Sequence, residues 1–168
     1  VIEYYRRRAA AGVGLIITEG TVVGHQASNG YPNVPHFYGE AALAGWKKVV
    51  DAVHAEGGKI VPQLWHVGSV RRIGTEPDAS VPAYGPMEKL KDGNVVVHGM
   101  TVQDIQAVIA AFAQAAKDAQ SIGMDGVEIH GAPGSLVDQF FWEGSNQRTD
   151  EYGGSLANRS RFAIELIQ

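Results

Sequence analysis

Two short apolar segments of the chain carry side chains that can do chemistry. The segment 59–65 contains Gln63 and ends in Trp65, and the segment 126–130 ends in His130. Side chains alternate between the faces of a strand, so Gln63 and Trp65 share a face that His130 can share from a neighbouring strand. An imidazole can donate or accept a proton, and a carboxamide offers donors and an acceptor. The spacing therefore predicts that an amide, an indole and an imidazole converge on one site.

The elements that must position these groups alternate between helices and strands. Hydrophobic periodicity and glycine stop signals predict both kinds. Helices are expected at 2–11, 41–56, 101–122 and 155–168, and buried strands at 14–18, 59–65 and 126–130. Apolar strands separated by helices are typical of parallel βαβ units with right-handed crossovers. The predicted fold class is therefore α/β.

The long irregular segments all follow strands, whereas the turns from helix to strand are tight. In α/β barrels the ligand lies at the carboxyl ends of the strands, where these segments gather. Function is therefore expected in residues 18–38, 63–100 and 130–154, with a loop over 20–35, a hairpin arm near 94–98 and a helical turn near 137–141. Thr101 and Asp104 have the spacing of a capping box at the start of the third helix.

Three strands cannot close a barrel, and an open half would leave strand edges exposed. The chain also starts on a predicted helix and ends inside one. We therefore expect a single partial barrel domain over residues 1–168, which either is completed by a missing half or self-associates. The alternative is a three-stranded α/β domain that is complete in itself.

Composition limits the class of protein. Hydrophobic residues make up 45% and charged residues 19% of the 168, and the net charge is −4, which indicates a globular chain and argues against nucleic-acid binding. There is no cysteine, so disulfides and thiolate chemistry are excluded. No apolar run is long enough to suggest a membrane span or a signal peptide, and we expect a cytoplasmic protein.

A long motif carries a family resemblance. Residues 126–132 read GVEIHGA, residues 138–140 read DQF, and residues 146–162 read NQRTDEYGGSLANRSRF. This pattern resembles the old yellow enzyme family, with ITEG at 17–20 and QLWHVG at 63–68 matching in order and spacing. The resemblance implies part of an FMN-binding (β/α)₈ barrel, from the first helix through the fourth. The family's first strand and strands five to eight, with their flavin-binding arginine and phosphate site, have no counterpart here.

The resemblance also implies roles for single residues. Gln63 corresponds to the glutamine that binds the flavin pyrimidine edge, and Gly20 to the glycine whose backbone lies near the isoalloxazine ring. His130 corresponds to the histidine at the cofactor that also hydrogen-bonds the substrate carbonyl, which makes the β-carbon of an activated alkene electrophilic. Tyr31 and Trp65 are expected to line the substrate pocket. The implied activity is an ene reductase in which FMN, reduced by NADH or NADPH, passes hydride to a small carbonyl compound.

Two positions depart from the family pattern. Three residues after His130 the family has a second histidine or an asparagine, and this chain has Pro133. Two residues further on, the family often has a tyrosine that donates a proton, and this chain has Ser135. The polarising pair is therefore reduced to one residue. Water or Tyr31 is left as the proton donor.

Other polar residues are expected to have structural roles. His66 either reaches substrate or caps the loop that follows the second strand, and the capping role is favoured. The long motif contains Arg148, Asp150, Arg159 and Arg161. Arginine–carboxylate pairing that fixes this loop is the expected reason for them.

Other classes of protein were weighed. The six histidines show no His-x-His or His-Glu-x-x-His spacing, so no metal site is predicted. A barrel aldolase needs a lysine at a strand end, and Lys59 lies at the start of its strand. A truncated half-barrel that no longer binds FMN by itself remains the alternative to the enzyme.

Overall fold

The computed structural model describes all 168 residues. The elements in chain order are α1 (Ile2–Ala10), β1 (Leu15–Val22), α2 (Glu40–Ala55), β2 (Lys59–Trp65), the 3₁₀ helix η1 (Gly68–Val70), β3 (Ala83–Gly85), β4 (Lys89–Lys91), β5 (Asn94–Gly99), α3 (Val102–Ser121), β6 (Glu128–Ile129), α4 (Leu136–Phe141) and α5 (Leu156–Ile167). The predicted order of four main helices and three main strands is confirmed. None of the helices combines the length and the apolar run that crossing a bilayer requires.

The main sheet has the strand order β1-β2-β6, and both pairings are parallel. Two boundaries differ from the prediction. β1 runs on to Val22, so Gly20 lies inside the strand and not in the following loop. β6 is limited to Glu128 and Ile129 and pairs with β2 alone, at the edge of the sheet.

A bulge interrupts the pairing of β1 with β2. Ile17 pairs with Val61 and Gly20 pairs with Gln63, so three steps on β1 match two steps on β2. The Thr18 hydroxyl accepts a hydrogen bond from the Gln63 backbone N–H at 3.0 Å and thus replaces a ladder bond. The extra residue brings Gly20 onto the same face as Gln63.

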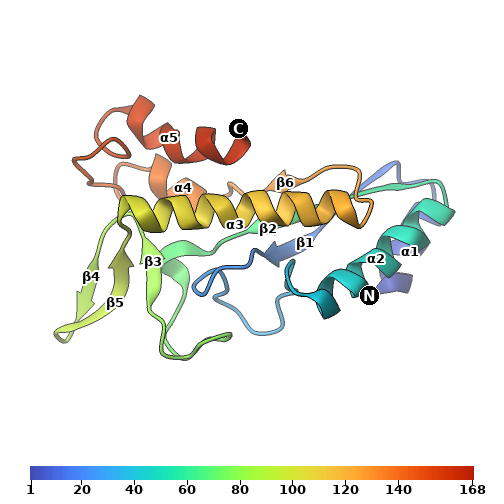
Figure 1. Ribbon diagram of the computed structural model, residues 1–168, viewed down its shortest axis with the longest axis horizontal. Coiled ribbons are helices and arrows are strands. Elements are labelled where there is room, and N and C mark those ends of the chain that lie inside the picture. Colours follow the sequence, from blue (N-terminus) through green and yellow to red (C-terminus); the bar gives the residue numbers. More distant parts are fainter.

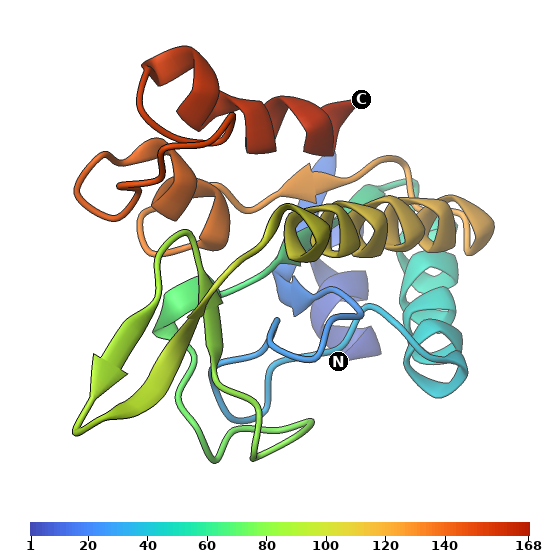
Figure 2. The ribbon, with the colours of Figure 1, turned by 60° about the vertical axis from the view of Figure 1, so that its left-hand side comes forward.

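The helices cover only one face of the main sheet. Ile16, Ile60 and Leu64 point to this face and pack in one core with residues of α1, α2, α3 and α5. Figures 1 and 2 show α3 along the sheet, with α1 and α2 on one side of it and α4 and α5 on the other. The opposite face is open, and Leu15 and Ile17 are 56% and 49% exposed. The prediction of a buried strand at 14–18 is therefore wrong for Leu15 and Ile17, because no element packs on the inward face.

The long segment after β2 forms a second small sheet. Its strand order is β3-β5-β4, with β4 and β5 antiparallel. Figure 2 shows β4 and β5 projecting from the body as an arm. The predicted hairpin arm is confirmed, and the short strand β3 was not predicted.

The predicted helix starts are also confirmed. Thr101 and Asp104 form a complete capping box at α3. Ser155 caps α5 by accepting a hydrogen bond from the Asn158 N–H at 3.2 Å. The helical turn expected at 137–141 is α4, which begins one residue earlier.

Candidate functional site

The candidate site lies on the inward face, at the carboxyl ends of β2 and β6. Gln63 is the register partner of Glu128, and the next pair on these strands is Leu64 with Ile129. Leu64 is 1% exposed and belongs to the core on the helix side. Alternation therefore turns Gln63 and Trp65 inward. The structure thus brings Gln63, Trp65 and His130 onto one face.

Three aromatic rings form a row along this edge. The indole of Trp65 stacks on the ring of Tyr31, with centroids 5.6 Å apart and planes 20° apart. On its other side the indole meets the imidazole of His130 edge to face, at 5.2 Å and 81°. Tyr31, predicted to line the pocket from the loop after β1, therefore reaches the same site through Trp65.

Gly20 lies against this row. A Cβ atom at Gly20 would be 2.6 Å from Cε3 of Trp65, so any side chain there would displace the indole. The structure thus gives Gly20 a reason to be glycine that does not involve a ligand. Its expected place beside a flavin ring stays a prediction.

Several polar groups on the inward face have no partner within the chain. Gln63 uses its backbone groups with Thr18 and Thr21, and its carboxamide makes no hydrogen bond. The backbone N–H of His130 bonds to the Leu64 carbonyl, and its imidazole is likewise without a hydrogen bond. These two side chains are therefore available to a ligand.

Two more polar atoms of this region are buried without a hydrogen-bond partner. They are Nε1 of Trp65 and Oε2 of Glu128. An unsatisfied buried polar group typically costs about 1–3 kcal/mol. The inward face thus carries polar atoms for which this chain alone provides no hydrogen bond, as expected for a surface that binds a ligand or another segment.

His66 is buried below the row and has a structural role, as the sequence favoured. Its Nδ1 accepts a hydrogen bond from the Gly68 N–H at 3.0 Å, and its Nε2 lies 3.0 Å from Nδ1 of His25. The first bond makes Nε2 the protonated nitrogen, so His66 donates to His25. Burial lowers the pKa of His25 to about 4 and places that of His66 well below its usual range. Both rings are therefore neutral connectors between the loops that follow β1 and β2.

Neither of the two positions that depart from the family pattern supplies a polar side chain to the aromatic row. Ser135 is 2% exposed, and its hydroxyl caps α4 by accepting a hydrogen bond from the Asp138 N–H at 3.3 Å. Pro133 is exposed in the turn before it. Ser135 thus has a local structural role as an acceptor, and its buried alcohol is a poor acid for proton transfer.

The arginines of the long motif fix loops, mostly through carbonyl groups. Arg148 pairs with Asp150 through two nitrogens and also donates to the Pro86 carbonyl at 2.9 Å and to that of Met100. Arg159 donates to the carbonyls of Phe141 and Gly154 and lies 3.8 Å from a Glu143 carboxylate oxygen. Arg161 donates to the Glu151 carbonyl. The predicted carboxylate pairing is therefore the main contact only for Arg148.

Two buried residues that organise the site were missed by sequence reasoning. Gln139, inside the DQF motif, accepts from the Ser69 N–H at 2.8 Å and donates to the carbonyls of Val67 and Gly134. It thus ties the loop after β2 to the loop after β6. Arg71, 3% exposed, donates only to backbone carbonyls. The position of Gln139 in the motif was a signal for the first, and the sequence around Arg71 offered none.

Comparison with known proteins gives consistent matches over the whole chain. A family profile described as the NADH:flavin oxidoreductase / NADH oxidase family matches residues 1–168. Flavin oxidoreductase hxnT of Emericella nidulans is 43% identical over 176 residues, covering 99% of this chain and 44% of that protein. 12-Oxophytodienoate reductase 7 of Oryza sativa subsp. japonica is 42% identical over 178 residues, covering 99% of this chain and 45% of that protein.

A solved structure agrees in fold. Morphinone reductase in complex with tetrahydroNAD matches with a TM-score of 0.87 and 37% identity, over 99% of this chain and 49% of that chain. The fold is therefore part of a (β/α)₈ barrel. The chain spans about half the length of the relatives it matches.

Proposed function

Because the chain belongs to the NADH:flavin oxidoreductase / NADH oxidase family, we propose that it carries the substrate-facing part of an FMN-dependent ene reductase. The predicted resemblance to the old yellow enzyme family is thereby confirmed at the level of the family. The proposed reaction is reduction of the activated C=C bond of a small carbonyl compound, with NADH or NADPH as the reductant.

The observation that carries the proposal is the pair of unpartnered groups on the inward face. The carboxamide of Gln63 offers two N–H donors and a carbonyl acceptor, which fits the alternating donors and acceptors of a flavin pyrimidine edge. His130 directly follows β6, two residues after Glu128, the register partner of Gln63. The donor set therefore fits FMN, which when bound supplies the hydride.

The residues of this chain would bind the cofactor, orient the substrate and polarise its carbonyl group. Gln63 holds the cofactor edge, with the backbone at Gly20 nearby. His130 donates a hydrogen bond to the carbonyl oxygen of the substrate, where negative charge develops during hydride addition. In a site that excludes water such a donor is worth about 2.7–4 kcal/mol of transition-state stabilisation. Trp65 and Tyr31 form an aromatic wall beside it.

The final proton needs a source other than the usual tyrosine position. Ser135 is buried, its oxygen accepts a hydrogen bond as the cap of α4, and an alcohol is a poor acid. Tyr31 is 43% exposed and stacks on Trp65, which holds its phenol ring at one end of the aromatic row. Tyr31 or water is therefore the proposed donor.

The remaining strands must come from elsewhere. The open inward face and the unpaired edges of β1 and β6 favour completion by the missing half of the barrel or by self-association. We further propose a cytoplasmic location, which cell fractionation tests.

A second function is favoured by one observation. The indole of Trp65 already fills the space over Gly20 where a flavin ring is expected. Together with the half-length of the chain, this supports a non-catalytic half-barrel that does not bind FMN by itself.

The two functions are separated by FMN titration of the 168-residue chain and of the longest product of its gene. The proposed enzyme predicts flavin absorbance in the long product and oxidation of NADH or NADPH when an α,β-unsaturated ketone is added. Gln63→Leu should weaken FMN binding, and the exposed Gln103→Leu should not. If no product binds FMN, the enzyme proposal is wrong and the half-barrel function stands.

A further inference from the structure

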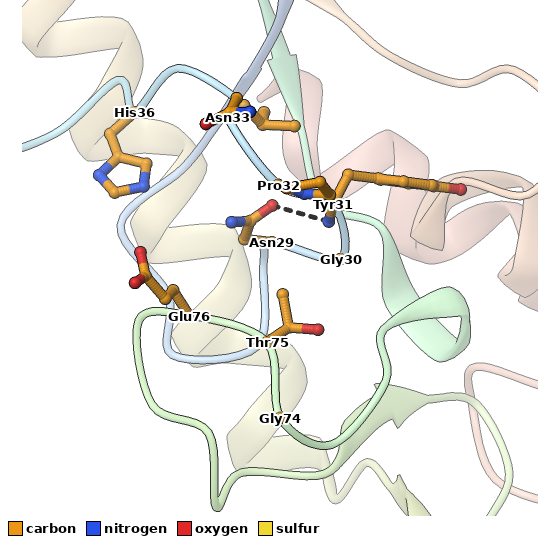
Figure 3. A pocket seen from close by; sticks show the side chains of 10 residues that line it. Asn29, Gly30, Tyr31, Pro32, Asn33, His36, Gly74, Thr75 and Glu76 are labelled. Carbon is orange, nitrogen blue, oxygen red and sulfur yellow. Dashed lines mark hydrogen bonds between the residues drawn. The ribbon is translucent and has the colours of Figure 1, made fainter.

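A polar cavity lies behind Tyr31, apart from the aromatic row. Its volume is about 430 Å³, within the range of small-molecule sites. Its walls are the loop after β1, residues 29–36, and the loop after β2, residues 74–76. Figure 3 shows the Tyr31 ring pointing away from the space that His36 and Glu76 face. Only two of the ten lining residues are hydrophobic, so the cavity suits a polar ligand.

One buried side chain aims an unused donor into this cavity. Asn29 is 4% exposed, and its Oδ1 accepts a hydrogen bond from the Tyr31 N–H at 3.1 Å. This bond fixes the orientation of the amide, because only the oxygen can accept. The Nδ2 group makes no hydrogen bond within the chain and points into the cavity in Figure 3.

A buried arginine holds the two walls together. Arg71 donates to the carbonyl of Asn29 at 2.6 Å on one wall, and to the carbonyls of Thr75 at 2.7 Å and Glu76 at 2.9 Å on the other. Further bonds to Val81 and Asp78 use the rest of the guanidinium. The cavity is therefore preorganised by a residue whose own donors are consumed and unavailable to a ligand.

The cavity presents a fixed donor and a carboxylate, and the polar side chains of Asn33, His36 and Thr75 also line it. Asn29 offers N–H groups, and Glu76, at the exposed rim, forms no ion pair or side-chain hydrogen bond within the chain. An ammonium group only donates, so it would leave Asn29 unmatched. A phosphate or carboxylate only accepts, and Glu76 would repel it. A hydroxyl both donates and accepts, and two neighbouring hydroxyls can satisfy both residues.

We propose that this cavity binds the vicinal diol of a sugar, with Asn29 donating to one hydroxyl and Glu76 accepting from the next. The diol belongs either to a neutral glycoside or to a ribose of the nicotinamide coenzyme. The proposal does not depend on flavin binding, because Asn29, Glu76 and Arg71 are not among the residues proposed to hold the flavin.

The test is a titration of the ¹⁵N-labelled 168-residue chain, followed by NMR through the side-chain amide of Asn29. The probes are methyl β-D-ribofuranoside and its 2-deoxy counterpart. We expect a saturable shift of the Asn29 amide with the diol and at least about tenfold weaker binding of the deoxy sugar. Two variants should lower the affinity by a similar factor. Asn29→Asp keeps the acceptor for Tyr31 and removes the donor, and Glu76→Gln removes the carboxylate.

These variants change the charge in opposite directions, so a common loss of affinity cannot come from net charge. Glu151→Gln, a loss of charge at an exposed position outside the cavity, should bind as the parent does. NADH distinguishes the sources: a coenzyme ribose predicts that NADH shifts the Asn29 amide at lower concentration than methyl β-D-ribofuranoside does, and a separate glycoside predicts that NADH binds more weakly than the free sugar. Absence of a saturable shift with every probe, or equal binding of the diol and the deoxy sugar, would overturn the proposal whatever the flavin titration shows.

Discussion

The imidazole of His130 meets the indole of Trp65 edge to face, with the ring centroids 5.2 Å apart. Trp65 ends β2 and His130 directly follows β6, which pairs with β2 in parallel, and neither ring has a hydrogen-bond partner in the chain. The contact orients the imidazole by packing and leaves its nitrogens free. This combination suits a group that must donate to a ligand from a fixed direction.

Replacing His130 should therefore affect turnover more than cofactor binding. In the full-length protein we expect His130→Ala to lower kcat by about 10²–10³ on an α,β-unsaturated ketone, in line with removal of one oxyanion donor. His130→Asn, which keeps an N–H donor, should recover part of the rate. Stopped-flow kinetics of alkene reduction, with FMN content measured on the same samples, checks this. Unchanged turnover in the alanine variant would remove His130 from the reaction.

Trp65 should act on the substrate side of the same row. Trp65→Phe keeps an aromatic ring between Tyr31 and His130, whereas Trp65→Ala removes both contacts. We expect the alanine variant to raise KM and the phenylalanine variant to change it little. Steady-state kinetics of both variants tests this order. The reverse order would mean that the indole obstructs the site and does not build it.

The bidentate pair of Arg148 and Asp150 should matter for stability. Arg148 is 10% exposed and also binds two backbone carbonyls, so Arg148→Met removes the ion pair of Asp150 and leaves the two carbonyls without this donor. The expected loss is roughly 2–3 kcal/mol in the free energy of unfolding. Arg161→Met, which removes one exposed bond, should cost less than about 1 kcal/mol. Urea denaturation of the two variants compares them directly, and equal losses would contradict the assignment.

Gly68 should tolerate no side chain. Its φ is +61°, and a Cβ atom there would lie 2.2 Å from Oε1 of Gln139. We expect Gly68→Ala to cost about 1–3 kcal/mol, in part through backbone strain and in part through the collision. Adding Gln139→Ala should relieve only the collision. A double-mutant cycle by thermal unfolding separates the two parts, and strict additivity would show that the side chains do not meet.

Acid should weaken the junction built by His25 and His66. Burial lowers the pKa of His25 from 6.5 to about 4, opposed by Asp104 and reinforced by Arg71, so the unfolded chain binds more protons between these values. The stability contributed by the neutral ring is fully present above pH 6.5 and is lost as the pH falls towards 4. The size of this effect is on the order of 2–3 kcal/mol. Melting temperatures measured across this window should fall less steeply for His25→Asn, and parallel curves would contradict the linkage.

The elements that depend on hydrophobic periodicity and on short local motifs could be predicted from the sequence. The helices, the parallel order and the capping box at Thr101 followed from local patterns, because these depend on neighbours within a few residues. The alternation that turns Gln63 and Trp65 inward was also readable, since strand geometry fixes it. The long motif led to the family and to part of a barrel.

The contacts that the prediction missed are non-local. The bulge in β1, which brings Gly20 into the strand, depends on the Thr18 hydroxyl meeting a backbone group of β2. The exposure of Leu15 and Ile17 reflects the absence of a partner, which apolar character alone does not reveal. Arg71 gives no motif, because its five acceptors are main-chain carbonyls that any sequence could supply.

The extra residue in β1 divides that strand into two stretches whose side chains are under different packing constraints. Upstream of it, Ile16 packs against the helices, so a substitution there affects the packing of the core. Downstream, Gly20 packs against Trp65, so a substitution there displaces a ring of the aromatic row. Loss of one residue between them would turn every later side chain of the strand over. A deletion at the bulge would therefore disturb the aromatic row more than a single replacement upstream of it.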